Sequence, residues 1–181
     1  MTAMTDTLYR NAQAGLPGHP GEFAPRQRLA STTTLAPTGG LTAAQSRQLG
    51  ASIVSRIDDA QASFSTTDLL ADGRESGRAH ALAETYARLV FDEGDGFDYA
   101  AEGETLLDDR LAGDAGAFDL PLDITARKRD EVVGYLRGRA AESFARATSG
   151  QEIEDVAAFH AGEYESFEEI ANELDFEEGG F

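Results

Sequence analysis

The sequence contains no cysteine and no tryptophan, and Lys128 is its only lysine. Without cysteine there can be no disulfide, no thiolate nucleophile and no cysteine-ligated zinc site. No stretch approaches the roughly 20 apolar residues that a membrane-spanning helix requires. The N-terminal residues also lack the apolar segment of a signal peptide. We therefore expect a cytoplasmic protein that does not enter a membrane.

Positive charge is scarce as well, because 33 acidic residues face 15 basic ones and the net charge is −18. A surface this acidic repels nucleic acid and attracts basic partners. The acid is concentrated in two blocks: residues 92–119 hold 10 acidic residues and 1 basic one, and residues 151–181 hold 11 and none. Adaptation to high salt would acidify every segment. The blocks therefore favour a localised role, with a merely solvating acidic tail as the alternative.

Residues 1–40 are predicted to be a disordered tail, because Pro17, Pro20, Pro25 and Pro37 interrupt a run rich in glycine, serine and threonine. Apolar residues then recur at helical spacing over residues 41–181. We expect one mainly α domain there, with no convincing repeat and few windows that alternate as strands do.

Several helices can be placed within this domain. Thr42 and Gln45 have the spacing of a capping box at the start of the first helix, whose apolar face we expect to extend to Phe64. A second helix is expected over residues 66–94, with a break near Gly73 to Gly77. Three leucines favour a short helix in the first acidic block: Leu106, Leu107 and Leu111. Thr125 is expected to cap a long helix with Phe144 on its core face.

The second acidic block is predicted to form two short helices, the first burying Ile153 and the two separated by a break at Gly162. Ser166 would cap the second, with Glu169 as its capping-box partner. Its inner stripe is expected to be Phe167, Ile170, Ala171 and Leu174. The acidic residues expected to contact a partner are Glu163, Glu165, Glu168, Glu169, Glu173, Asp175, Asp108 and Asp109.

Known catalytic and metal-binding motifs are absent from the sequence. It has no P-loop, no nucleophile elbow and no dinucleotide-binding glycine pattern. His160 is expected to be a half-buried packing residue, and His80 with Glu84 a solvated i, i+4 pair. The loop 92–98 is rich in oxygen ligands for calcium but lacks the EF-hand spacing, and a solvated turn fits it better. We expect no catalytic residue, no metal and no cofactor. The basic stretch 127–139 could contact phosphate, although a net charge of −18 makes non-specific affinity for DNA poor. A contact with the acidic blocks, within the chain or in a homodimer, is the alternative.

The segment from residue 159 to residue 174 resembles a motif of the ArdA-type antirestriction proteins. In that family an aromatic residue leads to a turn of glycine, acid and aromatic, followed by an acidic helix. The matching residues are Phe159, Gly162, Glu163, Tyr164, Ser166, Glu168, Glu169, Ile170, Ala171, Glu173 and Leu174. The resemblance implies a DNA mimic whose surface carboxylates occupy restriction–modification enzymes.

Charge and resemblance together favour a non-enzymatic acidic protein that inhibits or sequesters a basic, DNA-handling partner by phosphate mimicry. It would bind neither nucleic acid nor membrane directly. The alternative is a structural or accessory protein of a phage or mobile element, whose helices bind an assembly partner.

Overall fold

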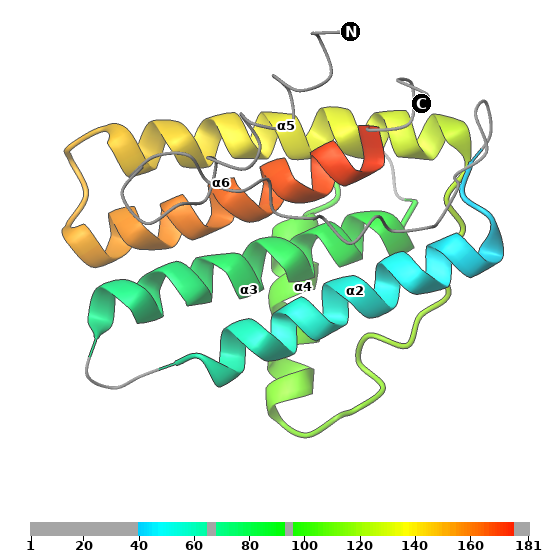
Figure 1. Cartoon of the computed structure of the whole chain (residues 1–181), viewed down its shortest axis with the longest axis horizontal. Coiled ribbons are helices and arrows are strands. Elements are labelled where there is room, and N and C mark those ends of the chain that lie inside the picture. The colour runs from blue at the N-terminus through cyan, green and yellow to red at the C-terminus, as the bar shows by residue number, and fades with distance from the viewer. Residues whose placement is uncertain (1–39, 65–67, 93–95, 176–181) are drawn as a thin grey trace, which may run out of the picture. The chain divides into compact units, whose positions relative to one another are not determined.

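The computed structural model describes residues 40–64, 68–92 and 96–175, which all belong to one unit of the chain, residues 35–181. Every regular element within these ranges is a helix (Figure 1), so the prediction of a mainly α fold is confirmed. The predicted disordered tail falls almost entirely outside the described residues. No helix in the described ranges combines the length and apolar character that a bilayer-spanning segment needs.

Helix α2 spans Ala43–Ala62 and begins as predicted. Thr42 Oγ1 accepts a hydrogen bond from the Gln45 backbone N–H at 3.3 Å, and Gln45 Oε1 accepts one from the Thr42 N–H at 2.8 Å. The capping box is therefore complete. On the predicted apolar face, Ile53 and Ile57 are fully buried and Leu49 is half-buried. Phe64, by contrast, is 46% exposed, because the helix ends before reaching it.

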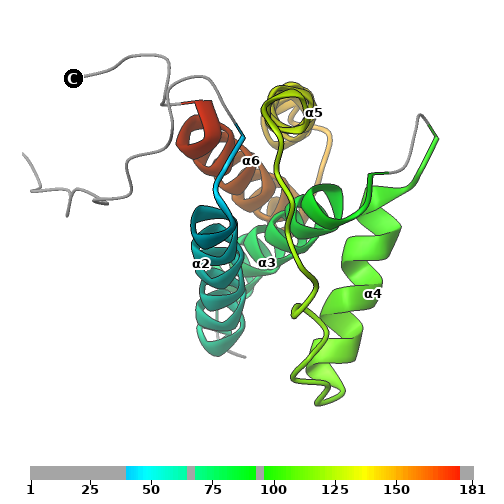
Figure 2. The same ribbon diagram turned by 90° about the vertical axis from the view of Figure 1, so that its right-hand side faces the viewer.

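Helix α3 spans Leu69–Val90 and packs against α2, α4 and α6 (Figure 2). The break predicted between Gly73 and Gly77 is wrong, because the helix continues through both. These glycines instead admit the backbone of α6. A Cβ on Gly77 would lie 1.9 Å from the Phe159 carbonyl oxygen, and one on Gly73 would lie 2.7 Å from that of Asp155. The two helices thus touch backbone to backbone at this seam.

Helix α4 spans Tyr99–Leu111 and runs across the direction of the other four (Figures 1 and 2). It packs mainly against α3, and single side chains reach α5, through the Tyr99–Tyr135 ring contact, and α2, through Arg110. Gly103 makes this contact close, since a Cβ there would lie 2.5 Å from the Glu84 backbone nitrogen. Leu106 is buried against the core, whereas Leu111 is 63% exposed. One side of α4 is therefore anchored to α3 and the rest is open to solvent.

Helix α5 spans Ala126–Thr148 and is capped by Thr125 as predicted, with Thr125 Oγ1 accepting from the Lys128 N–H at 3.2 Å. It runs antiparallel to α6, against which it packs (Figure 1). Phe144 was predicted in the core, but it is 51% exposed. Its ring instead covers that of Tyr164, with 5.2 Å between the centroids.

Helix α6 spans Glu154–Asp175 without interruption, so the prediction of two short helices is wrong. Gly162 does not end a helix. A Cβ on it would lie 2.0 Å from the Arg74 carbonyl oxygen, so glycine allows α6 to approach α3 there. Ser166 lies buried in the middle of the helix and caps nothing. Ile153, predicted to be buried, precedes the helix and is 68% exposed.

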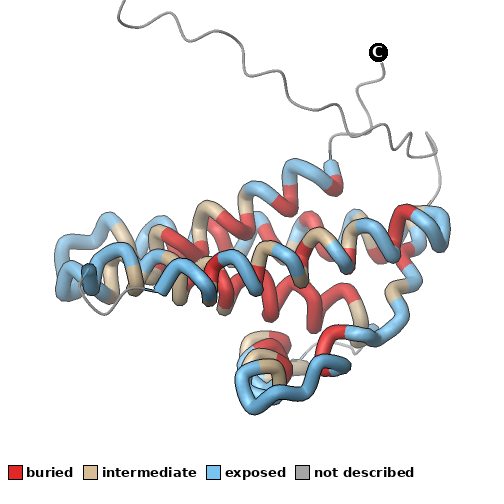
Figure 3. The backbone as a smooth tube through the Cα atoms, turned by 60° about the horizontal axis from the view of Figure 1, so that its bottom comes forward, coloured by how far each residue is buried: buried red, intermediate tan, exposed pale blue. Residues whose placement is uncertain are grey.

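The inner stripe predicted for the last helix is confirmed, because Phe167 and Ile170 are fully buried and Leu174 is 2% exposed. Figure 3 marks the buried positions in red along the backbone. Buried residues from all five described helices belong to one core. It includes Ile57 of α2 and Leu136 of α5. The acidic C-terminal block is thus part of the folded body as far as Asp175.

Candidate functional site

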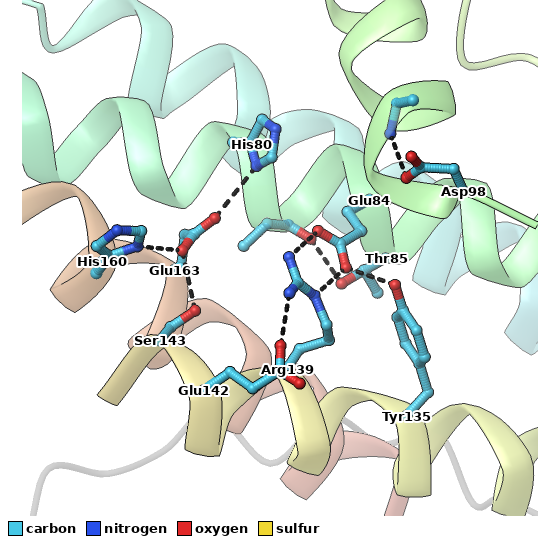
Figure 4. A network of polar contacts seen from close by, with 12 residues as sticks. His80, Glu84, Thr85, Asp98, Tyr135, Arg139, Glu142, Ser143, His160 and Glu163 are labelled. Carbon is cyan, nitrogen blue, oxygen red and sulfur yellow. Dashed lines mark hydrogen bonds and ion pairs between the residues drawn. The ribbon is translucent and has the colours of Figure 1, made fainter. Parts of the chain in front are cut away.

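Glu163 does not lie on the acidic surface, which corrects its assignment as a partner-binding residue. It is only 4% exposed and sits among side chains of three helices (Figure 4). Its Oε2 accepts a hydrogen bond from Ser143 Oγ at 2.9 Å and lies 2.8 Å from His160 Nδ1. Its Oε1 lies 3.3 Å from His80 Nδ1. A carboxylate enclosed in this way joins α3, α5 and α6, and cannot be offered to a partner.

The charge on Glu163 is stabilised by these neighbours. Burial alone would raise the pKa of Glu163, because a carboxylate loses hydration there. The contacts with His80, His160 and Ser143 outweigh burial and hold the pKa of Glu163 below its ordinary value. In return, the contact with Glu163 raises the pKa of His80 above its ordinary value, against the opposing effect of burial. Glu163 is therefore ionised at neutral pH.

This network has the composition of a catalytic triad but not its order. The hydroxyl of Ser143 donates to the carboxylate and has no hydrogen bond to either histidine. A serine nucleophile needs a base that accepts its proton, which this arrangement does not provide. His160, expected to be a half-buried packing residue, is 8% exposed and engaged by Glu163. The network therefore satisfies a buried charge and does not activate a nucleophile.

Most other acids of α6 that were predicted to contact a partner meet arginines of the same chain. The ion pairs are Arg74–Glu165, Arg56–Glu169, Arg56–Glu173 and Arg137–Asp175. The arginines come from α3, α2 and α5, so the pairs bind α6 to its neighbours. The pair with Asp175 is also the contact expected between the basic stretch and the acidic block. Glu168 is half-buried and forms no ion pair with a described cation.

The acids of α4 have a different environment. Asp108 and Asp109, both predicted to bind a partner, are exposed, and no basic side chain of the described residues pairs with them. Glu104 is also exposed and Glu102 is half-buried, and neither forms an ion pair with a described arginine or lysine, although Glu104 contributes to the raised pKa of His80. Arg110 is the only base of the first block, and it is engaged elsewhere. Its Nη2 lies 2.9 Å from Oδ2 of Asp58 in α2, and its Nη1 donates to the Ala115 backbone oxygen at 2.8 Å. We call Glu102, Glu104, Asp108 and Asp109 the α4 acidic surface.

A second buried carboxylate, Glu84, was not predicted. It is fully buried and accepts hydrogen bonds from Arg139 Nε at 2.6 Å and Nη2 at 3.0 Å. The Tyr135 hydroxyl donates to it at 2.6 Å (Figure 4). Burial and this hydrogen bond raise the pKa of Tyr135, while the hydrogen bond to Glu84 raises that of Arg139. The sequence pairs Glu84 with His80 as a solvated i, i+4 pair, whereas the fold gives it a partner on α5.

No group of three or more histidine and carboxylate side chains is arranged to hold a metal ion within the described residues. The loop considered for calcium, residues 92–98, lies partly outside those residues. Compared with known proteins, the chain matches no protein-family model, no curated protein and no solved structure. The likeness to antirestriction proteins therefore stays a prediction from residues 159–174.

Proposed function

We propose that this protein binds a basic, DNA-handling protein through the α4 acidic surface, whose carboxylates stand in for backbone phosphates. Such a partner would be blocked from its own DNA, as the resemblance to antirestriction proteins implies, and would be met in the cytoplasm. The contact is assigned to α4 because most acids of α6 are already bound to basic side chains of their own chain.

The observation that carries this proposal is a helix whose surface carboxylates form no ion pair with a described arginine or lysine, although Glu104 contributes to the raised pKa of His80. Glu104 and Asp108 stand one turn apart, a spacing at which like charges destabilise a helix by roughly 0.2–0.5 kcal/mol. The fold gains no ion pair from them to offset this cost. An interaction outside the chain would account for charges that cost stability.

The spacing suits a phosphate mimic. With a rise of about 1.5 Å per residue, the 13 residues of α4 extend for roughly 20 Å. The four carboxylates then give about one charge per 5 Å, compared with about one per 3.4 Å along a single DNA strand. Gly103 holds the helix tightly on α3, so the charges are presented by a rigid element. A rigid surface loses little conformational entropy when a partner binds.

An apolar side chain lies at the end of the same helix. Leu111 is 63% exposed, and Leu120 in the following loop is 39% exposed. Interfaces place apolar contacts at their centre and charges around the rim. A partner that covers Leu111 would therefore gain apolar burial in addition to the charge attraction.

A competition assay tests the proposal. A restriction–modification enzyme is mixed with limiting DNA and increasing amounts of this protein, and DNA cleavage is measured. The variant Glu104→Gln/Asp108→Asn/Asp109→Asn should raise the half-inhibitory concentration at least about tenfold at low salt, because association driven by charge slows when the charges are removed. The same variant should flatten the dependence of inhibition on ionic strength.

A matched control removes the same number of exposed charges elsewhere, with Asp59→Asn/Asp123→Asn/Glu152→Gln. This control should inhibit nearly as well as the wild type. Equal losses in both triple variants would mean that only net charge matters. No inhibition by the wild type, across enzymes of this class, would refute the proposal of a DNA-handling partner.

A further inference from the structure

The outward face of α5 has small side chains and is open to solvent. Gly134, Gly138, Ala141 and Ala145 are all exposed, and they follow one another at spacings of four, three and four residues. Residues with these spacings lie on one side of a helix. Helix α5 packs against α6 and α3 through its opposite side (Figure 2). No described helix therefore covers the outward face.

Gly134 and Gly138 differ from the other glycines inside the described helices. A Cβ added at either position would meet nothing within 4 Å. The other helical glycines each face a neighbouring segment, and at Gly77, Gly103 and Gly162 a Cβ would lie within 2.5 Å of neighbouring backbone. Glycine inside a helix is less stable than alanine, because it loses more conformational freedom on folding. A backbone outside the described chain would account for this cost on α5.

The exposed charges of α5 are balanced, unlike those of the whole chain. They comprise three basic and three acidic residues: Arg127, Arg137, Arg146, Asp130, Glu131 and Glu142. Two copies of a chain with a net charge of −18 repel each other over most of their surfaces. Two copies can approach each other with little repulsion where the charge is balanced, as it is on α5.

The order of these charges suits a second copy that runs antiparallel. Glu131 lies near the start of α5, and Arg146 lies in its last turn and forms no ion pair with a described carboxylate. In an antiparallel pair centred between Gly138 and Ala141, Glu131 of one copy lies about 3 Å along the axis from Arg146 of the other. Two-fold symmetry makes this contact twice. A parallel pair would place like charges opposite each other, which is unfavourable.

Glu131 can accept this additional contact. Its Oε1 lies 3.1 Å from Nε of Arg127 one turn away, and its Oε2 lies 3.8 Å from Arg88 Nη2. The side chain of Glu131 is nevertheless 42% exposed. A carboxylate has about four acceptor sites. Glu131 therefore still has acceptor capacity on its solvent side for Arg146 of a second copy.

From these features we infer that the outward face of α5 is the interface between two copies of this chain, with the two α5 helices packed antiparallel. The glycines and alanines allow the helix axes to approach to about 8 Å, the lower end of the usual range. Arg146 of each copy pairs with Glu131 of the other. No residue of α4 takes part, so this inference does not depend on the proposed function.

Sedimentation of the full chain at increasing concentration tests the interface. We expect a reversible dimer with a Kd of roughly 1–100 µM, because one helix pair buries less area than a standard interface. Gly138→Gln should weaken dimerisation at least about tenfold, since the side chain keeps the helix axes apart. It should not lower the thermal midpoint of the monomer, because position 138 is open and glutamine is the better helix former. The control Ala51→Gln adds the same group at an exposed position of α2 and should leave the Kd unchanged.

A charge exchange tests the antiparallel arrangement. Arg146→Glu should weaken the dimer roughly five- to tenfold, because two ion pairs become repulsive. Adding Glu131→Arg restores both pairs with exchanged signs, so the double variant should bind within about threefold of the wild type. The chain has no cysteine, so Thr148→Cys admits one spin label per copy. The two labels should lie at least about 25 Å apart, compared with about 10 Å in a parallel pair.

Four outcomes would overturn the inference. A wild type that stays monomeric would show that α5 is no interface between copies. A dimer that persists in Gly138→Gln would place the interface elsewhere. A double variant as weak as Arg146→Glu, or a label distance near 10 Å, would contradict the antiparallel pair. The triple variant of α4 should dimerise like the wild type, so the dimer and the proposed function can each fail alone.

Discussion

Helices α4 and α6 are both acidic and amphipathic, yet their acids have opposite surroundings. Four acids of α6 contact arginines of α2, α3 and α5, and Glu163 is buried against two histidines, whereas Glu154, Asp155 and Glu168 form no ion pair with a described cation. Those of α4 are exposed or half-buried and form no ion pair with a described arginine or lysine. A count of charge by segment ranks the C-terminal block first, at a net −11 against −9. The charge available to a partner therefore depends on which side chains the fold places beside the acids.

The difference has a topological cause. Helix α6 packs against both α3 and α5, so its flanks lie within reach of their side chains. Helix α4 packs mainly on α3, reaches α5 and α2 through Tyr99 and Arg110, and crosses the direction of the bundle. Most of its circumference therefore meets no other described helix. Most acids of a helix inside the bundle are paired with basic side chains of its neighbours. The acids of a helix at the edge keep their negative electrostatic field.

The largest loss of stability is expected from a substitution that disrupts the close contact between α3 and α6. A methyl group at Gly77 would collide with the Phe159 carbonyl oxygen at 1.9 Å, so Gly77→Ala must push α6 away from α3. We expect the free energy of unfolding to fall by about 3 kcal/mol, as measured by chemical denaturation.

Gly134→Ala in α5 is the matched control for this change. A Cβ at that position meets nothing within 4 Å, and alanine is the better helix former. The control should therefore stabilise the protein by roughly 0.5–1 kcal/mol. Equal effects of the two substitutions would contradict the close contact of α3 and α6.

The second prediction compares the loss of stability when one acid of α6 and one acid of α4 are neutralised. Glu163→Gln removes a buried charge that is held by His80, His160 and Ser143. Hydrogen bonds to charged groups contribute about 1.5–3 kcal/mol, so we expect a loss in this range at pH 6. Glu104→Gln removes an exposed charge of α4 and should change stability by less than about 0.5 kcal/mol. A similar loss for both would mean that the two acidic helices are not distinct.

Local signals of the fold were readable in the sequence. The capping box of Thr42 and Gln45, the cap at Thr125 and the stripe from Phe167 to Leu174 depend on neighbouring residues, and all are confirmed. Glycines were misread, because a glycine that ends a helix looks the same as one that admits a neighbouring backbone. Gly77 and Gly162 are of the second kind, which only the tertiary packing reveals.

The misplaced break at Gly162 also hid the buried acid. Read as one helix, the segment buries residues 160, 163, 167, 170 and 174, at alternating spacings of three and four, so Glu163 falls on the inner stripe. That pattern was available in the sequence and would have separated Glu163 from the surface acids. The ion pair of Arg56 with Glu173 was not, because these residues lie 117 positions apart. Ion pairs between residues so far apart in the sequence become visible only when the packing of the helices is known.

The third prediction concerns the pH dependence of stability that arises from the contact between His80 and Glu163. The raised pKa of His80 means that its contribution is complete below its ordinary pKa of 6.5 and is lost as pH rises through the folded value. The lowered pKa of Glu163 means that its contribution is present above 4.5 and is lost as pH falls through the folded value. The link between them should therefore stabilise α6 most between these two limits.

The variant His80→Gln isolates this link. The groups that act on His80 are Glu163 from α6, Glu84 from its own helix and Glu104 from α4. The thermal midpoint of the wild type should exceed that of the variant most near pH 5.5, and the gap should narrow towards pH 9. Lost packing of the imidazole on Phe159 is independent of pH and would shift all values equally. A gap that stays constant across pH would contradict a charged link.

The smallest changes in stability are expected when exposed acids of α6 and α4 are neutralised. Glu173 Oε1 lies 2.5 Å from Arg56 Nη2, so Glu173→Gln should destabilise the protein by about 0.2–1 kcal/mol, the range for exposed ion pairs. Asp108 has no such partner among the described residues and stands one turn from Glu104. Asp108→Asn should therefore stabilise the protein by roughly 0.2–0.5 kcal/mol through relief of repulsion. Both differences should shrink in about 1 M salt, because ions screen exposed charges. The measurement is the free energy of unfolding by urea at low and high salt. The opposite signs of the two changes are the critical result. Destabilisation by both substitutions would mean that α4, like α6, uses its acids to stabilise the fold. The proposal that the α4 acidic surface binds a partner would then be contradicted.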